Sequence, residues 1–206
     1  LPQDFYDYGS NYGYDLYTPD ADDEYYEELT DATTDGLSYQ VEWHQETAYP
    51  DNSDENAYLS LYYPTFSGDH EELLESINGK VREMIHRYDG SYTEDGAVVS
   101  TVVYVTLMDE DRLSLVCKYE VSGKNDYYGL DALNMDMTTG TDIPNSTLLE
   151  VDYTLVTRFR VQNSKQNGSI TWLDDMSDEE LLKILSDDEK RVVFLTPVGT
   201  EVGVNT

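Results

Sequence analysis

Apolar positions along the chain recur with a period of two residues in some stretches and of three to four residues in others. The stretch "LSYQVEWHQETAYP" alternates so that Leu37, Tyr39, Val41 and Trp43 share one face, which predicts a strand. A second strand is predicted in "NAYLSLYYPTF", and Pro64 and the turn around Gly68 would end it. The sequence therefore predicts that regular structure begins near residue 37.

The clearest helix lies in "DHEELLESINGKVREMIHRY", at about residues 69–88. Its apolar residues recur at steps of three and four and form one stripe, consisting of Leu73, Leu74, Ile77, Val81, Met84, Ile85 and Tyr88. Asp69 is expected to cap this helix, and Glu72 would complete a capping box three residues later. We therefore expect one long amphipathic helix.

Strands and helices are mixed in the rest of the chain. A hairpin is predicted in "AVVSTVVYVTLM" and "RLSLVCKYEVSG", and a strand in "LDALNMDM". Helical spacing occurs in "STLLEVDYTLVTRFRVQN", and "SDEELLKIL" is a short helix with Ser177 and Glu180 as a capping box. The end, "KRVVFLTPVGTEVGVNT", predicts one or two strands. The expected class is α+β, with a mixed or antiparallel sheet, the helix 69–88 and one or two shorter helices.

Residues 1–36 are acidic and rich in tyrosine, and they contain no basic residue and few aliphatic ones. Such a segment buries too little apolar surface to offset its ordering entropy, so we expect a disordered tether. The alternative is that its tyrosines pack on this or a neighbouring domain. Residues 37–206 are expected to form the α+β domain, which could consist of two sub-domains at about 37–145 and 146–206.

The charge of the chain limits its partners. Its 206 residues include 43 acidic and 12 basic side chains, which gives a formal net charge of −31. No nucleic-acid partner is expected, because such binding relies on Lys and Arg that displace phosphate counterions. Anionic lipids and wall polymers would be repelled and a cationic partner attracted. Alternatively, the charge only keeps an exported protein soluble. No stretch approaches the ~18 apolar residues of a transmembrane segment.

The motifs of common catalytic and metal sites are absent from the sequence. It contains no GxSxG, HExxH, GxGxxG or phosphate-binding loop and no paired cysteines. Cys117, the only cysteine, alternates with apolar residues and is expected to be a small buried side chain. We therefore predict no catalytic residues, no cofactor and no metal ligand.

A glycine-flanked loop is the candidate contact surface. It contains Asn125, Asp126, Tyr127 and Tyr128. Exposed tyrosines supply rigid contact area at a low entropy cost, as binding surfaces require. The alternative is that these tyrosines only close over the edge of the sheet, because Tyr is amphipathic and often half-buried.

Three stretches together resemble a bacterial extracytoplasmic domain family. They are "NAYLSLYYPTFSGDHEELLESINGKV", "LSLVCKYEVSGKNDYYGLDALNMDMTTGTDI" and "VVFLTPVGTEVGVN", and the resemblance covers about residues 38–206. That family includes the sensor domain of the lysozyme-responsive anti-sigma factor and an accessory domain of a cell-wall deacetylase. Many of its members are lipoproteins or single-span proteins of Gram-positive bacteria.

The resemblance implies a non-enzymatic, cell-surface binding or sensor module, extracytoplasmic or secreted, with a lipid anchor upstream of Leu1. The partners it implies are a lysozyme-like muramidase or peptidoglycan, and the acidity favours the first, because lysozymes are typically cationic. Two alternatives remain open. One is an enzyme acting on cell-wall polysaccharide, or its accessory domain. The other is a structural spacer domain of a lipoprotein.

Overall fold

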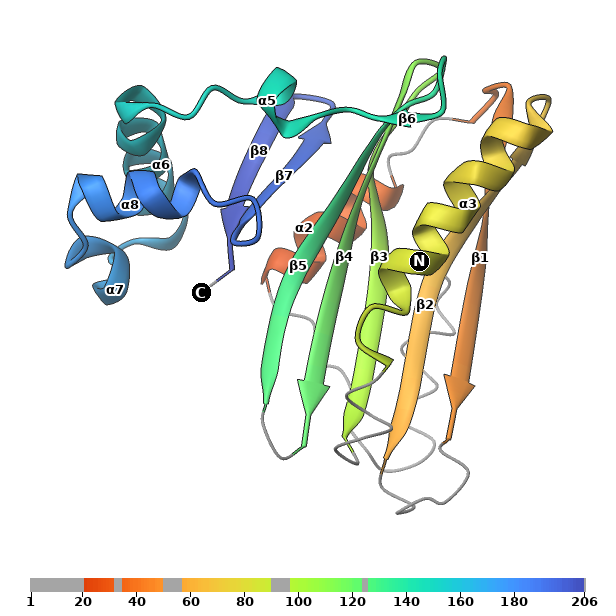
Figure 1. Cartoon of the computed structure of the whole chain (residues 1–206), viewed down its shortest axis with the longest axis horizontal. Coiled ribbons are helices and arrows are strands. Elements are labelled where there is room, and N and C mark those ends of the chain that lie inside the picture. Colours follow the sequence, from red (N-terminus) through yellow and green to blue (C-terminus); the bar gives the residue numbers. More distant parts are fainter. Residues whose placement is uncertain (1–20, 32–34, 50–56, 90–96, 124–125, 206) are drawn as a thin grey trace.

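The computed structural model describes residues 21–31, 35–49, 57–89, 97–123 and 126–205, and its fold is α+β, as the sequence predicts. Within these residues the main sheet has six strands in the order β1-β2-β3-β4-β5-β6, and β7 and β8 form a second sheet (Figure 1). The strands are β1 (Tyr39–Ala48), β2 (Tyr58–Gly68), β3 (Val98–Met108), β4 (Arg112–Ser122), β5 (Tyr127–Asp136), β6 (Thr141–Asp142), β7 (Arg191–Thr196) and β8 (Gly199–Val204). The helices are α2 (Ala21–Asp31), α3 (Glu71–Ile85), α5 (Asn145–Leu148), α6 (Tyr153–Asn167), α7 (Thr171–Asp174) and α8 (Asp178–Leu185).

The helix α3 covers one face of the main sheet. It makes the crossover between β2 and β3, which run parallel, whereas the other neighbouring strands are antiparallel. Its predicted apolar stripe is confirmed, because the helix packs on β2 to β5 through the buried side chains Leu74, Ile77, Val81, Met84 and Ile85.

The predicted cap of α3 is wrong. His70 occupies the N-cap position, and no side chain caps the helix. Asp69 instead continues the pairing of β1 with β2, since its backbone N–H donates to the Ser38 carbonyl at 3.1 Å. The capping box of α8 is confirmed, with Ser177 and Glu180 in both of its hydrogen bonds.

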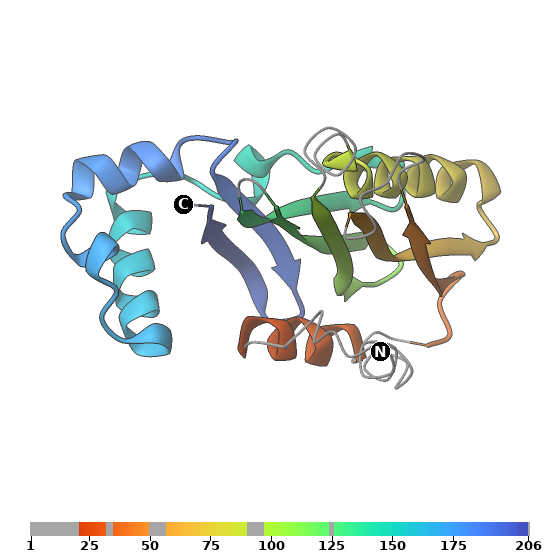
Figure 2. The ribbon, with the colours of Figure 1, turned by 90° about the horizontal axis from the view of Figure 1, so that it is seen from below.

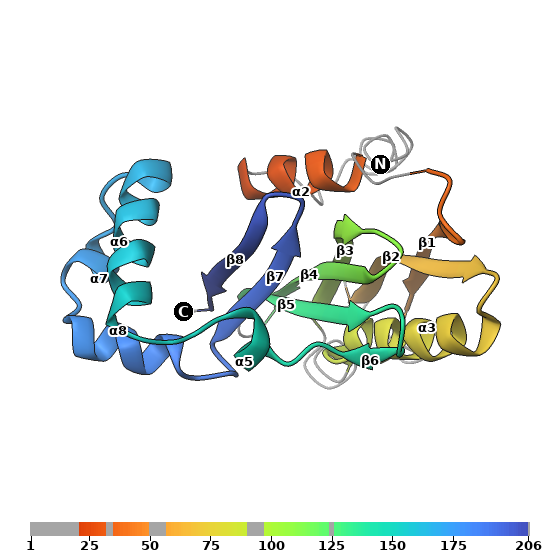
Figure 3. The same ribbon diagram turned by 90° about the horizontal axis from the view of Figure 1, so that it is seen from above.

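The opposite face of the main sheet is covered by α2 and by β7 (Figures 2 and 3). Their shared buried cluster consists of Tyr26, Tyr62, Val102, Tyr104, Val116, Val192 and Phe194. Both faces of the central strands are therefore buried over much of their length, which explains why consecutive residues are buried at 101–108 in β3 and at 113–117 in β4.

Residues 21–31 of the expected tether form α2, which packs on the main sheet as the stated alternative has it; residues 1–20 and 32–34 lie outside the described part of the chain. The Tyr26 ring, 7% exposed, packs between the rings of Tyr104 and Phe194. The Thr30 hydroxyl accepts a hydrogen bond from the Val105 N–H at 3.1 Å, beside an irregularity in the β3–β4 register. Contacts with the sheet thus supply the stability that the composition of this segment lacks.

A buried polar junction joins the main sheet to β7. The Ser114 hydroxyl on β4 accepts from the Leu195 N–H at 2.9 Å and donates to the Asn134 side-chain oxygen at 2.7 Å. The Asn134 amide on β5 donates to the Val193 carbonyl at 2.7 Å. These two side chains supply hydrogen-bond partners for backbone groups at the outer edge of β7, which no strand covers in the described part of the chain.

A third buried cluster lies among α6, α7, α8 and the hairpin formed by β7 and β8. Its buried members are Val156, Leu173, Leu181 and Leu185, and Val202 and Val204 of β8 pack against them. Arg160 holds α7 and the loop after it by donating to the carbonyls of Leu173 and Met176. None of the helices in the described residues combines the length and apolar character of a transmembrane segment.

The docking of α2 predicts the effect of a single substitution. Thr30→Val keeps the shape of the side chain but leaves the buried Val105 N–H without its acceptor. We expect it to lower the free energy of unfolding by about 1–3 kcal/mol in urea denaturation. Thr30→Ser is the control and should retain most of the stability, because it keeps the hydroxyl. Equal stability of the wild type and the valine variant would contradict the docked position of α2.

Candidate functional site

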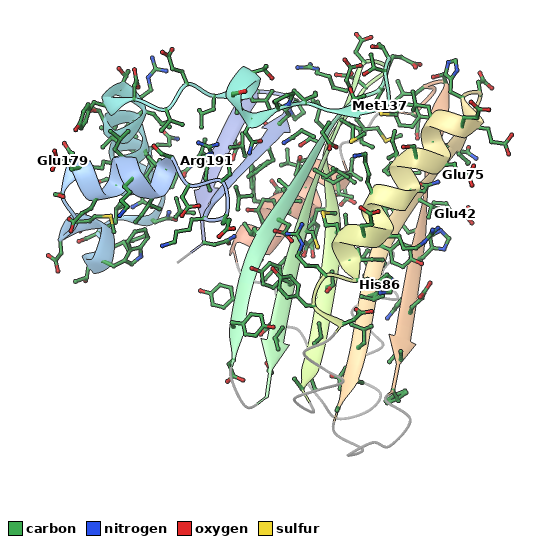
Figure 4. All side chains as sticks on the ribbon, viewed as in Figure 1. Glu42, Glu75, His86, Met137, Glu179 and Arg191 are labelled. Atoms are coloured by element: carbon green, nitrogen blue, oxygen red, sulfur yellow. The ribbon has the colours of Figure 1, made fainter. Side chains whose placement is uncertain are left out.

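A hollow of about 330 Å³ lies between the C-terminal half of α3, the outer edge of β5 and the turn before β7. We call it the β5 cleft. Charged side chains from segments far apart in the sequence line it, namely Lys80, Arg87, Asp131, Asp142, Asp188 and Arg191. Figure 4 marks Arg191, which lies where the turn enters β7.

The cations of the β5 cleft are held in ion pairs. The Lys80 Nζ lies 3.0 Å from the Asp142 carboxylate, and the Arg87 guanidinium lies 2.7 Å from Asp131. Arg191 pairs with Asp188 and also donates to the Leu185 carbonyl at 2.6 Å.

Two further carboxylates, Glu83 and Glu189, line the β5 cleft. Each lining cation already has a carboxylate partner, so these two leave the cleft with a surplus of negative charge.

Asp131 is the most deeply placed of these carboxyl groups, with its side chain 18% exposed. Burial raises its pKa above the usual value, and the Arg87 guanidinium opposes this shift. The ion pair therefore stabilises a charge that burial alone would disfavour.

The outer edge of β5 is partly occupied by the end of the described chain. The Asn205 side chain accepts from the Leu130 N–H at 2.9 Å and donates to the Leu130 carbonyl at 2.8 Å. It thereby pairs this residue of β5 as a neighbouring strand would. Gly129 permits the approach, since a Cβ there would lie 2.4 Å from the Tyr119 hydroxyl and 3.0 Å from the Asn205 side-chain oxygen.

Three tyrosines stand next to the β5 cleft, beside the Arg87–Asp131 pair. The rings of Tyr88 and Tyr119 are stacked with centroids 4.0 Å apart. The Tyr127 ring meets both edge-on, at 6.0 and 6.4 Å. Burial is the main cause that raises the pKa of Tyr88, and a hydrogen bond to Tyr119 adds to it. We call these three residues the tyrosine cluster.

The four residues of the predicted contact loop do not form one loop in the structure. Asn125 lies outside the described residues, and the Asp126 side chain accepts from the Gly123 N–H at 2.7 Å. Tyr127 and Tyr128 belong to β5 and not to a loop, because they pair with Val121 and Glu120 of β4. Tyr127 is 38% exposed and joins the tyrosine cluster, whereas Tyr128 is 78% exposed.

Most of the residues that line the β5 cleft could not be predicted from the sequence. Arg87, Asp131 and Arg191 come from three elements that no short motif connects. Tyr88 and Tyr119 had a signal, because Tyr88 ends the apolar stripe of the helix and Tyr119 alternates with Cys117.

The structure also bears on the predicted chemistry. Cys117 is buried as predicted, at 1% exposure, and burial raises the pKa of its thiol. Such a thiol is a poor nucleophile, because the thiolate is the reactive form. Among the described residues, no three His, Cys, Asp or Glu side chains come together as a metal site would require.

No family model matches this sequence, and no curated protein sequence matches it. Among solved structures, the chain is similar to a DUF3298 family member from Bacteroides fragilis, at 15% identity and a TM-score of 0.44, covering 82% of this chain and 89% of that one. It is also similar to a DUF3298 family protein from Pseudomonas aeruginosa, at 10% identity and a TM-score of 0.45, covering 61% of this chain and 65% of that one. Neither protein is described as an anti-sigma factor or a deacetylase.

The close packing at Gly129 gives a matched pair of substitutions. Gly129→Ala pushes a methyl group into the Tyr119 hydroxyl and Asn205, and we expect it to lower the free energy of unfolding by about 1–3 kcal/mol. Gly79→Ala is the control, because a Cβ there meets nothing within 4 Å inside α3. It should raise the free energy of unfolding by about 1 kcal/mol. Urea denaturation of both variants checks this, and a neutral Gly129→Ala would contradict the described packing.

Proposed function

We propose that the chain is a non-catalytic binding module of the extracytoplasmic space and that its partner is a cationic protein. A lysozyme-like muramidase is the first candidate. The observation that carries this proposal is the position of Tyr127 and Tyr128, two exposed aromatic side chains at the edge of an acidic sheet. The extracytoplasmic location rests on the sequence resemblance.

The charges around these tyrosines support a cationic partner. The cations Lys80, Arg87 and Arg191 of the β5 cleft are already paired with carboxylates, so they add little attraction for an anion. The chain as a whole carries a net charge of −31. Its long-range field steers a cationic protein towards the surface, and rigid tyrosines supply short-range contact area there.

The state of Asp131 supports a non-catalytic role. A general acid of a glycosidase needs a carboxyl group that stays protonated near neutral pH. Burial raises the pKa of Asp131 even against the opposing Arg87 guanidinium, but the carboxylate is held 2.7 Å from that guanidinium in an ion pair. The support for a non-catalytic role is this ion pair and not the direction of the pKa shift.

Wall glycan is the second candidate ligand, and the lining of the β5 cleft favours it. The amide of Asn145 and the paired charges offer donors and acceptors for sugar hydroxyl groups. The tyrosine cluster provides aromatic rings beside them. A volume of about 330 Å³ lies at the small end of ligand sites.

Titration calorimetry with a C-type lysozyme at low and high salt tests the first candidate. We expect saturable binding at both salt concentrations, weaker at high salt because charge attraction is screened. Tyr128→Ser should lower the affinity about tenfold if this ring lies in the contact. Tyr49→Ser is the matched control, since Tyr49 is also exposed but follows β1 at the other edge of the sheet.

Three results would contradict the proposal in different ways. No heat at either salt concentration excludes a lysozyme partner. Binding that disappears at high salt and ignores both tyrosine substitutions indicates charge attraction alone. Hydrolysis of purified wall polymer by the chain would overturn the non-catalytic role.

A further inference from the structure

A second and larger hollow, of about 660 Å³, lies between β8, α6 and the segment 148–152. We call it the β8 groove. Figures 2 and 3 show α6 standing beside β8 on the side away from β7. The β8 groove shares no lining residue with the β5 cleft, so its function is independent of the one proposed above.

One edge of the β8 groove is a strand with unpaired backbone groups. The Val193 carbonyl accepts a hydrogen bond from Asn134, and the Leu195 N–H donates one to Ser114. The backbone groups of these two β7 residues therefore point towards the main sheet and away from β8. In an antiparallel pair, when the backbone groups of one residue point away from the partner strand, those of the residue directly opposite do so as well. The residues opposite Val193 and Leu195 on β8 are Val202 and Thr200.

The backbone N–H and C=O groups of Thr200 and Val202 therefore point away from β7, towards the β8 groove that both residues line. Within the described residues these groups have no hydrogen-bond partner, and β8 pairs with no strand other than β7. An edge of this kind is a template for another strand.

The opposite wall offers apolar side chains. Val156 is the one residue of α6 that is fully buried, whereas Leu155 and Phe159 are half-buried and line the β8 groove with Leu148. An exposed strand edge with apolar side chains beside it can bind an extended peptide by strand addition.

The charges of the β8 groove select the occupant. Glu150, Asp152 and Glu201 line it against one cation, Arg158, in a chain with a net charge of −31. We propose that the β8 groove binds an extended segment of a partner protein, which adds to β8 as a strand and alternates apolar with basic side chains. Its main chain pairs with Thr200 and Val202, and its apolar side chains contact Leu155 and Phe159.

Amide exchange measured by NMR tests the strand addition. The probe is a blocked peptide of about seven residues that alternates valine and lysine. We expect it to slow the exchange of the Thr200 and Val202 amides, which point into the β8 groove. Binding without slower exchange at Thr200 and Val202 would overturn the proposed pairing.

Two peptide controls separate strand addition from charge attraction. A peptide that alternates valine and glutamate should bind at least tenfold more weakly. N-methylation of every second residue should abolish binding in one of the two possible alternations and spare it in the other, because only one set of N–H groups faces β8. Equal binding of the acidic peptide, equal effects of both N-methylated peptides, or no binding of the basic peptide would each overturn the proposal.

A pair of variants on α6 tests whether the peptide binds in the β8 groove. Gln162 and Ser164 are both exposed, but Gln162 lines the β8 groove and Ser164 does not. Gln162→Trp should fill the β8 groove and lower the affinity for the valine–lysine peptide at least tenfold, and Ser164→Trp should leave it unchanged. Equal affinities of the two variants would place the peptide elsewhere.

Discussion

Two buried side chains, Ser114 and Asn134, hold the hairpin of β7 and β8 against the main sheet. They satisfy the backbone of Leu195 and Val193 at the outer edge of β7, where no neighbouring strand does so within the described residues. Buried polar groups of this kind are costly when unpaired, which makes the junction specific as well as stabilising. The β5 cleft lies on one side of the hairpin and the β8 groove on the other, so both depend on this junction for their shape.

The charges of the chain divide into paired cations and a large surplus of negative charge. Several cations of the described residues are used in ion pairs or as loop anchors, as Lys80, Arg87, Arg160 and Arg191 show. The remaining surface keeps its large negative charge, which provides long-range attraction for cationic partners without shape selectivity. Selectivity must then come from short-range features, and the structure offers two of different kinds. One is the exposed aromatic surface at β5, and the other is the unpaired backbone edge of β8.

Much of this fold could be predicted from the sequence, because apolar periodicity reports directly on buried faces. The stripe of α3 and the alternation in β1 are examples, and the capping box of α8 is another local signal. The helix α2 could not be predicted, since its stability comes from Tyr104 and Phe194, which lie far away in the sequence. The β5 cleft could not be predicted either, because two of its ion pairs join residues that lie far apart in the sequence. Tyr127 and Tyr128 suggested a loop because of the flanking glycines, but pairing with β4 extends β5 through both.

Native-state hydrogen exchange of the whole chain tests most directly whether the hairpin and the main sheet form one structural unit. The amide of Leu195 is informative, because it bonds only to the Ser114 side chain in the described structure. Our account predicts that its free energy of exchange equals that of amides in the centre of β4. A markedly lower value for Leu195 and the rest of β7 and β8 would show that the hairpin opens independently. That result would contradict the account, because neither the β5 cleft nor the β8 groove would then be preformed.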